Sequence, residues 1–143
     1  MTLSIFPDVN VWLTLTYQRH VHFQIADDWY NTLDESCVIY FSRQTQLGLF
    51  RLLTNVAVMQ EHAYTQRDCW QYYEEWMVSG RAKMMPEPFE LEKYFIARTS
   101  YEQSSTKEWA DAYLAAFAES AGLQLVTFDK VLAGKAKGSI LLA

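Results

Sequence analysis

The chain has 143 residues, of which half are apolar and 15% are aromatic, and its formal net charge at pH 7 is −5. This length suits one α/β domain over residues 1–143 with a sizeable core, and the apolar content excludes global disorder. The acidic balance disfavours a protein that binds nucleic acid mainly through a basic surface.

Apolar periodicity predicts regular elements along the first half of the chain. Short continuous apolar runs are typical of buried strands, and apolar residues spaced three and four apart are typical of helices that face a core. The expected elements are a strand at 3–7, helices at 9–17 and 20–33, a strand at 37–41 and a helix at 43–55. In the last of these helices, the residues predicted to face inward are Leu47, Phe50, Leu53 and Leu49.

The second half of the chain continues the alternation. We expect a helix at 65–78, a short strand within "RAKMMPEP", a helix from Pro88 to about Arg98, a helix over "TKEWADAYLAAFAESAG", a strand at 123–128 and a final strand in "SILLA". Gly80 and Gly122 are the expected stop signals of their helices. Ser105 or Thr106 is the expected N-cap of the helix before Gly122.

Alternating strands and helices predict a mainly parallel sheet with helices on both faces. In such sheets, ligands bind beyond the carboxyl ends of the strands, at a topological switch point. Asp8 follows the first apolar strand directly, and Asp129 follows the strand at 123–128. The two acids meet only if their strands are neighbours in the sheet, which the sequence leaves open.

A third acid, Asp111, lies in the first turns of its helix. Leu114 and Ala115, three and four residues further on, are apolar, which places Asp111 on or beside the inward face. For each acid alone a structural role stays open, because Asp8 and Asp129 suit helix caps and Asp111 suits the positive end of a helix dipole. Three acids that converge on one end of one sheet indicate more than three separate caps.

Three carboxylates at close range repel one another and raise one another's pKa unless a cation compensates. Oxygen ligands without His or Cys suit Mg²⁺ or Mn²⁺, which commonly retain waters and bind substrate phosphates. Such an ion activates a water and neutralises charge on a phosphodiester under attack. The acid cluster therefore predicts a phosphate-handling site despite the negative net charge.

At this point three sequence stretches indicate a family. "FPDVNVWL", "TQLGLFRLLTN" and "WADAYLAAFAESAGLQLVTFD", in this order, resemble the PIN-domain ribonucleases, specifically the VapC-type toxins of bacterial toxin–antitoxin pairs. The resemblance covers most of the chain and is weakest between about residues 56 and 104. It implies a PIN-like α/β/α sandwich around a mainly parallel sheet of four to five strands. It also implies Mg²⁺-dependent cleavage of RNA, a homodimer, and a small cognate antitoxin that blocks the site.

The matching motifs assign roles to individual residues. Asp8, Asp111 and Asp129 take the places of the catalytic metal ligands. Asn10 and Thr127 fill positions that typically support these acids by hydrogen bonding. The resemblance therefore implies an enzyme that hydrolyses RNA phosphodiesters with metal-activated water.

One position departs from the family pattern. The family commonly carries a Glu on its third helix, where this chain has Gln46. A neutral amide adds no charge, so we expect a second ion to be bound less fully, and a catalytically weakened PIN-like protein acting as a binding partner stays an alternative. The candidate RNA contacts are Lys130 and Arg43, and the "AGKAKG" loop keeps further lysines nearby in sequence.

Other readings are weaker. A haloacid-dehalogenase-like phosphatase also uses an Asp after its first strand, but it needs a second Asp where this chain has Asn10, which cannot act as the general acid. Cys37 and Cys69 belong to no Cys-x-x-Cys pair, and we expect them to be small buried thiols. No stretch reaches the ~18 apolar residues of a membrane span, and no leader is seen, so we expect a cytoplasmic protein.

Overall fold

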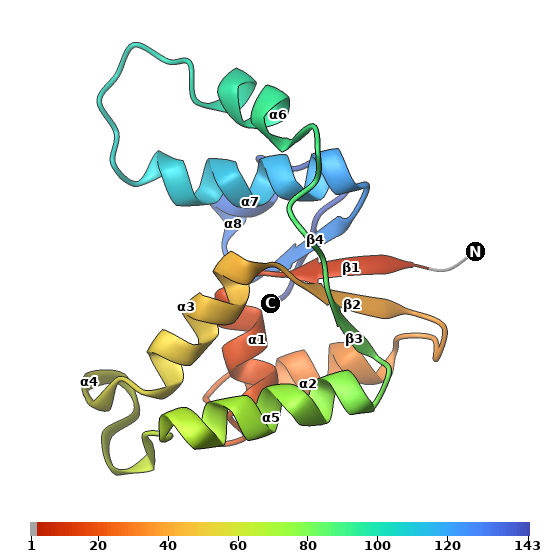
Figure 1. The fold of residues 1–143 in the computed structure, drawn as a ribbon, viewed down its shortest axis with the longest axis vertical. Helices are drawn as coiled ribbons and strands as arrows, with labels where there is room; N and C mark the ends of the chain where they lie inside the picture. Colours follow the sequence, from red (N-terminus) through yellow and green to blue (C-terminus); the bar gives the residue numbers. More distant parts are fainter. Residues whose placement is uncertain (1–2) are drawn as a thin grey trace.

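The strands of the protein form one parallel sheet. The structure is a computed structural model that describes residues 3–143, and the strand order in it is β3-β2-β1-β4-β5 (Figure 1). The strands are β1 (Ser4–Pro7), β2 (Val38–Phe41), β3 (Ala82–Met84), β4 (Gln124–Thr127) and β5 (Ile140–Leu141). Every pairing is parallel, which confirms the predicted sheet. The chain builds outward from β1 to β3 and then returns to the other side of β1, so the topological switch point lies between β1 and β4.

Helices cover both faces of this sheet. The helices are α1 (Val9–Thr16), α2 (Phe23–Asn31), α3 (Arg43–Leu53), α4 (Val56–Met59), α5 (Gln66–Val78), α6 (Leu91–Arg98), α7 (Glu108–Ala121) and α8 (Lys130–Ala133), with a 3₁₀ turn, η1, at Gln60–His62. Figure 1 shows α6 and α7 on one side of the sheet and α1, α2, α3 and α5 on the other. The predicted α/β/α sandwich is confirmed.

Alternating side chains of the central strands supply the two layers of core. Phe6 of β1 points toward α7 and stacks on Phe117, with ring centroids 4.8 Å apart. On the other side of the sheet, Trp12 of α1 stacks on Phe41 of β2, with centroids 3.7 Å apart. Stacked, fully buried rings fix α1 and α7 relative to the strands. These two helices begin at the carboxyl edge of the sheet, so the packing also fixes that edge.

Some expectations about single residues and helix starts were wrong. Leu47 is 54% exposed, because α3 packs inward through Leu49 and Leu53 on another of its faces. Neither Ser105 nor Thr106 caps α7, whose N-cap is Lys107 without a side-chain hydrogen bond. The second helix begins at Phe23 rather than His20, and the one expected from Pro88 begins at Leu91. The short elements α4, η1 and α8 were not predicted, because four residues or fewer carry no periodicity.

Other expectations are confirmed. Gly80 and Gly122 both follow helices with positive φ, at 77° and 68°. Cys37 and Cys69 are free and buried. In residues 3–143, no helix has the length and apolar content needed to cross a membrane.

Candidate active site

The carboxyl ends of β1 and β4 lie next to each other at the switch point. Pro7 pairs in register with Val126, and the backbone N–H of Asp8 donates to the carbonyl of Val126 at 3.0 Å. The chain then leaves β1 through Asp8 and leaves β4 through Asp129, two residues after the end of the strand. The sheet therefore brings to one edge the two acids whose proximity the sequence left open.

Asp8 is held at this edge by both of its carboxylate oxygens. Its side chain is buried, with 6% of the residue exposed. Oδ1 accepts the backbone N–H of Val11 at 3.0 Å, which makes Asp8 the N-cap of α1, and Oδ2 accepts the hydroxyl of Thr127. The capping role that the sequence allowed for Asp8 is therefore present, and it fixes the direction of the carboxylate without closing its remaining lone pairs.

Burial raises the pKa of Asp8 above its ordinary value, and the charges of Asp129 and Asp111 raise it further. The hydrogen bonds from Thr127 and from the backbone of Val11 act in the opposite direction. A carboxylate that is both desolvated and surrounded by like charge is stabilised by a nearby cation. Asp8 therefore has the electrostatic surroundings of a carboxylate that a bound cation would stabilise.

Thr127 connects two of the acids. Its fully buried hydroxyl donates to Asp8 and accepts the backbone N–H of Asp129 at 3.0 Å. The Asp129 carboxylate in turn accepts the N–H groups of Val131 and Leu132, at 2.8 and 3.3 Å, and so caps α8. The support expected of Thr127 is present, and one hydroxyl sets the positions of two acids.

Asp111 approaches the same edge from α7. It is half-buried in the first turn of that helix, on the face that packs toward the sheet. Burial raises the pKa of Asp111, and the charges of Asp129 and Glu108 raise it further, whereas the ammonium of Lys135 lowers it. Asp8, Asp111 and Asp129 thus come from three separate segments, and the charge of Asp129 raises the pKa of both Asp8 and Asp111.

The acids are close enough to interact but are not gathered into a closed cage. Within residues 3–143, no three His, Cys, Asp or Glu side chains are placed so that they alone hold one metal ion. This donor set is nevertheless well matched to Mg²⁺, which usually takes one or two protein carboxylates directly and keeps several waters. All its side chains offer oxygen, and Asp8 lacks a compensating charge, so the residues present fit a hard divalent cation.

Gln46 lies at the same edge, one turn into α3, and only 2% of it is exposed. Its carbonyl oxygen accepts a hydrogen bond from the guanidinium of Arg43. Arg43 itself is exposed, as is Lys130 at the start of α8. The structure therefore places Gln46 inside the protein and leaves both candidate RNA contacts open to solvent.

Asn10 does not give the support that was expected of it. The side chain of Asn10 is exposed. Its backbone carbonyl, not its amide side chain, accepts a hydrogen bond from the hydroxyl of Thr14 at 2.7 Å. Asn10 lies in the first turn of α1, and the Asp8 carboxylate is bonded instead by the backbone N–H of Val11 and the hydroxyl of Thr127.

Lys135 belongs to the "AGKAKG" loop that the sequence indicated, but the sequence did not single out Glu108 beside Asp111. Glu108 lies three residues before it on α7 and forms an ion pair with Lys135 at 2.6 Å. The same two residues line a cavity of about 530 Å³ bounded by the segment between α6 and α7. Glu108 could have been found from its spacing, because residues three apart lie on one face of a helix. The cavity could not, because the segment 99–107 has no hydrophobic periodicity.

Comparison with known proteins agrees with the fold. The PIN domain family matches residues 5–138. Ribonuclease VapC41 of Mycobacterium tuberculosis is 38% identical over 126 residues, which is 85% of this chain and 86% of that protein. Among solved structures, VapC20 of M. tuberculosis, described as a sarcin–ricin loop cleaving toxin, has a TM-score of 0.62 at 16% identity, over 91% of this chain and 93% of its own.

A toxin–antitoxin complex from Klebsiella pneumoniae contains a chain with a TM-score of 0.59 at 15% identity, with 95% of each chain covered. At such identities, the two solved structures support the fold alone. The family match covers residues 5–138, which include Asp8, Asp111 and Asp129, and the match to VapC41 covers 85% of this chain. This chain belongs to the PIN-domain family, among its VapC-type members.

Proposed function

We propose that this chain, as a single PIN-like domain over residues 1–143, is a Mg²⁺- or Mn²⁺-dependent endoribonuclease. It hydrolyses RNA phosphodiesters and acts as the toxin of a toxin–antitoxin pair. One observation carries the proposal: the neighbouring strands β1 and β4 and the hydroxyl of Thr127 hold Asp8 and Asp129 at one edge of the sheet. The charges of Asp129 and Asp111 raise the pKa of Asp8 there. The relative named Ribonuclease VapC41 supports the reaction class.

In this proposal, Asp8, Asp111 and Asp129 would hold the cation. When bound, the cation supplies positive charge that acidifies a water and offsets the charge of the phosphodiester. Thr127 keeps the Asp8 carboxylate in one orientation through its hydroxyl, and it fixes Asp129 through the backbone N–H of that residue. A rigid mount of this kind costs no rearrangement when the substrate arrives.

Arg43 and Lys130 are the proposed contacts to the RNA backbone. Each lies in the first turn of a helix that begins at the acid edge, and each is exposed. A cation at a helix N-terminus adds to the positive end of the helix dipole, which favours a phosphate there. Two such positions flanking the acids give a polyanion a local attraction that the net charge of −5 does not.

The proposed partners are a small cognate antitoxin and a second copy of the chain. The structural neighbour from K. pneumoniae is described as a toxin–antitoxin complex. In this chain, α5 presents both a core and an exposed side, since Trp76 packs edge-on against Trp12 while Trp70 is 54% exposed. Exposed aromatic residues are typical of the centres of interfaces. An RNA-cleaving toxin meets its substrate in the cytoplasm, which is the location that we propose.

A second candidate function rests on Gln46. Its amide is buried and its carbonyl oxygen is engaged by Arg43, so it adds no charge for a second ion. A member with incomplete metal binding acts as a binding partner rather than as an enzyme. This candidate predicts no cleavage with any divalent cation and no growth arrest when the chain is expressed alone.

The test uses the purified protein and a structured RNA, with Mg²⁺, with Mn²⁺ and with a chelator. The proposal predicts internal cleavage that needs the cation and is lost in Asp8→Ala. Asp28→Ala is the matched control, because Asp28 is an exposed acid on α2, away from the acid edge. Full cleavage by Asp8→Ala, or cleavage in the chelator, contradicts the assignment of the site.

A further inference from the structure

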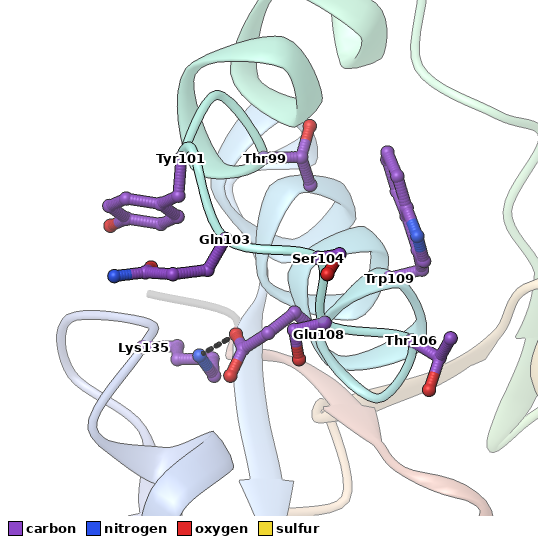
Figure 2. Close-up of a pocket in the computed structure, with 9 residues that line it drawn as sticks. Thr99, Tyr101, Gln103, Ser104, Thr106, Glu108, Trp109 and Lys135 are labelled. Carbon is purple, nitrogen blue, oxygen red and sulfur yellow. Dashed lines mark hydrogen bonds and ion pairs between the residues drawn. The ribbon is translucent and has the colours of Figure 1, made fainter.

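A cavity of about 530 Å³ lies beside the acid edge and has no role in the chemistry described so far. Its walls come from the segment 99–107 between α6 and α7, from the first turn of α7, and from Lys135 after α8 (Figure 2). Figure 2 shows Tyr101 and Gln103 projecting on one side of the cavity, with Trp109 at the other side. The volume falls in the range of about 300–1,000 Å³ that is typical of small-ligand sites.

The cavity is connected to the acid edge through two residues. Glu108 and Lys135 line it and form the one interaction that Figure 2 marks among the residues drawn, at 2.6 Å. Asp111 lies three residues after Glu108, on the same face of α7. The charge of Lys135 also lowers the pKa of Asp111, so the ammonium lies within electrostatic range of this acid. A chain of nucleotides that passes the acids therefore reaches this cavity within about one helical turn.

The lining suits a flat heteroaromatic group. Trp109 is 56% exposed, and its ring packs edge-on against Phe95, with the centroids 6.0 Å apart and the ring planes at 74°. Tyr101 is 71% exposed and offers a second aromatic face from the opposite wall. Gln103 adds an amide that both donates and accepts, and Ser104 adds a hydroxyl. Aromatic faces with a few polar groups are how proteins bind unstacked bases.

The charge of the chain gives a separate reason for base contacts. With 17 acidic and 12 basic side chains, the protein lacks the basic surface that lets phosphate contacts dominate the affinity for nucleic acid. An acidic nuclease needs another source of affinity for RNA, and the stacking of unpaired bases supplies one that does not depend on net charge.

We infer that the cavity formed by Tyr101, Gln103, Trp109 and Lys135 is a nucleobase subsite. It takes one unpaired base of the RNA adjacent to the phosphodiester at the acid edge. Tyr101 and Trp109 supply the stacking faces, Gln103 contacts the edge of the base, and Lys135 contacts a phosphate of the same strand. The inference rests on the proposed function in that it takes RNA as the ligand, and it assigns sequence preference to the segment 99–107.

The experiment measures binding, so that it does not depend on cleavage. The protein carries Asp8→Asn to prevent turnover, and the probes are fluorescently labelled single-stranded oligo(A) and oligo(U) ribonucleotides, titrated with the full chain and followed by anisotropy. Tyr101→Ala and Trp109→Ala are added separately to this background. Phe89→Ala is the matched control, because Phe89 is an exposed aromatic residue that does not line the cavity.

The inference predicts that each cavity variant weakens binding of the preferred oligonucleotide by about tenfold or more and reduces the difference between oligo(A) and oligo(U). The Phe89→Ala control is expected to bind as the Asp8→Asn parent does. Tyr101 is the safer position, because it is largely exposed and its removal leaves no void, whereas Trp109→Ala is checked by its melting temperature.

Unchanged affinity in Tyr101→Ala and in a folded Trp109→Ala overturns the inference, as does the absence of binding by the parent. Capture of an apolar peptide by the cavity with no response to either oligonucleotide also overturns it, in favour of a protein ligand. Failure of the proposed function has a different signature: the unmutated chain does not cleave RNA with Mg²⁺ or Mn²⁺, whatever the oligonucleotides do.

Discussion

The acid edge and the neighbouring cavity are built in opposite ways. At the edge, Asp8 is buried, hydrogen-bonded at both oxygens and attached to a central strand. In the cavity, Tyr101 and Trp109 are more than half exposed, and most of the lining belongs to a segment without regular structure. This difference fits two separate roles. Bond cleavage needs groups fixed on rigid elements, as at the acid edge, whereas recognition is commonly carried by loops, as at the cavity.

The largest expected effect is on RNA cleavage in Asp8→Asn, a substitution that changes the acid edge and leaves the cavity intact. Asp8→Asn keeps the N-cap, since Asn is also a good capping residue, but removes the charge that holds the cation. Because a metal ion contributes several kcal/mol to such a reaction, cleavage of RNA should fall by about a thousandfold or more. Binding of oligoribonucleotides in anisotropy titrations should change little. If Asp8→Asn loses RNA binding as completely as it loses cleavage, the two regions do not act separately.

Thr127→Val removes the hydroxyl that orients two acids while keeping the volume of the side chain. Loss of a supporting partner of this kind typically costs about 10- to 100-fold in activity or metal affinity. The hydrogen bond from Thr127 lowers the pKa of Asp8, so its removal raises that pKa and moves the acidic limb of the pH–rate profile to higher pH. Thr127→Ser should restore most of the activity and the original profile. A Val variant with an unshifted profile contradicts the role given to this hydroxyl.

Gln46→Glu tests how far the acid edge extends toward α3. The new carboxylate is placed at a buried position beside the guanidinium of Arg43, and it adds a charge that a cation can use. We expect Mg²⁺ affinity, measured by calorimetry, to rise by about tenfold. In a chelator the variant should melt at a lower temperature than the unmutated protein, because the buried charge then has only Arg43 as a partner. Unchanged Mg²⁺ affinity places Gln46 outside the metal site.

The smallest expected effect lies where the two regions meet. Lys135→Met removes the ion pair with Glu108, whose partners are 24% and 44% exposed, so the loss of stability should be at most about 1 kcal/mol. The ammonium lowers the pKa of Asp111, so without it that pKa rises and the acidic limb of the pH–rate profile moves slightly upward. A shift in the same direction but smaller than that of Thr127→Val is expected. A downward shift contradicts the placement of Lys135 near Asp111.

The sequence was sufficient for the parallel sheet and for naming Asp8, Asp111 and Asp129 as candidate ligands, but it left open whether the acids meet. Apolar runs end at Asp8 and near Asp129, and the alternation of elements predicts a parallel sheet. It was not sufficient for Asn10 and Leu47, whose direction depends on how α1 and α3 pack against their neighbours. The cavity was also not predicted. The segment 99–107 has no hydrophobic periodicity, and the ion pair at the cavity wall joins Glu108 to Lys135, which are 27 residues apart in the sequence.

In the proposed function, Asp8, Asp111 and Asp129 form one cation site. The most direct measurement is the melting temperature at neutral pH, with millimolar Mg²⁺ or Mn²⁺ and with a chelator, for the unmutated chain and for Asp8→Asn, Asp111→Asn and Asp129→Asn. A ligand that binds the folded state alone raises the melting temperature. We expect the cation to raise the melting temperature of the unmutated protein, and each single substitution to remove or strongly reduce that rise. A rise that survives in full in any one of the three variants would contradict a shared site.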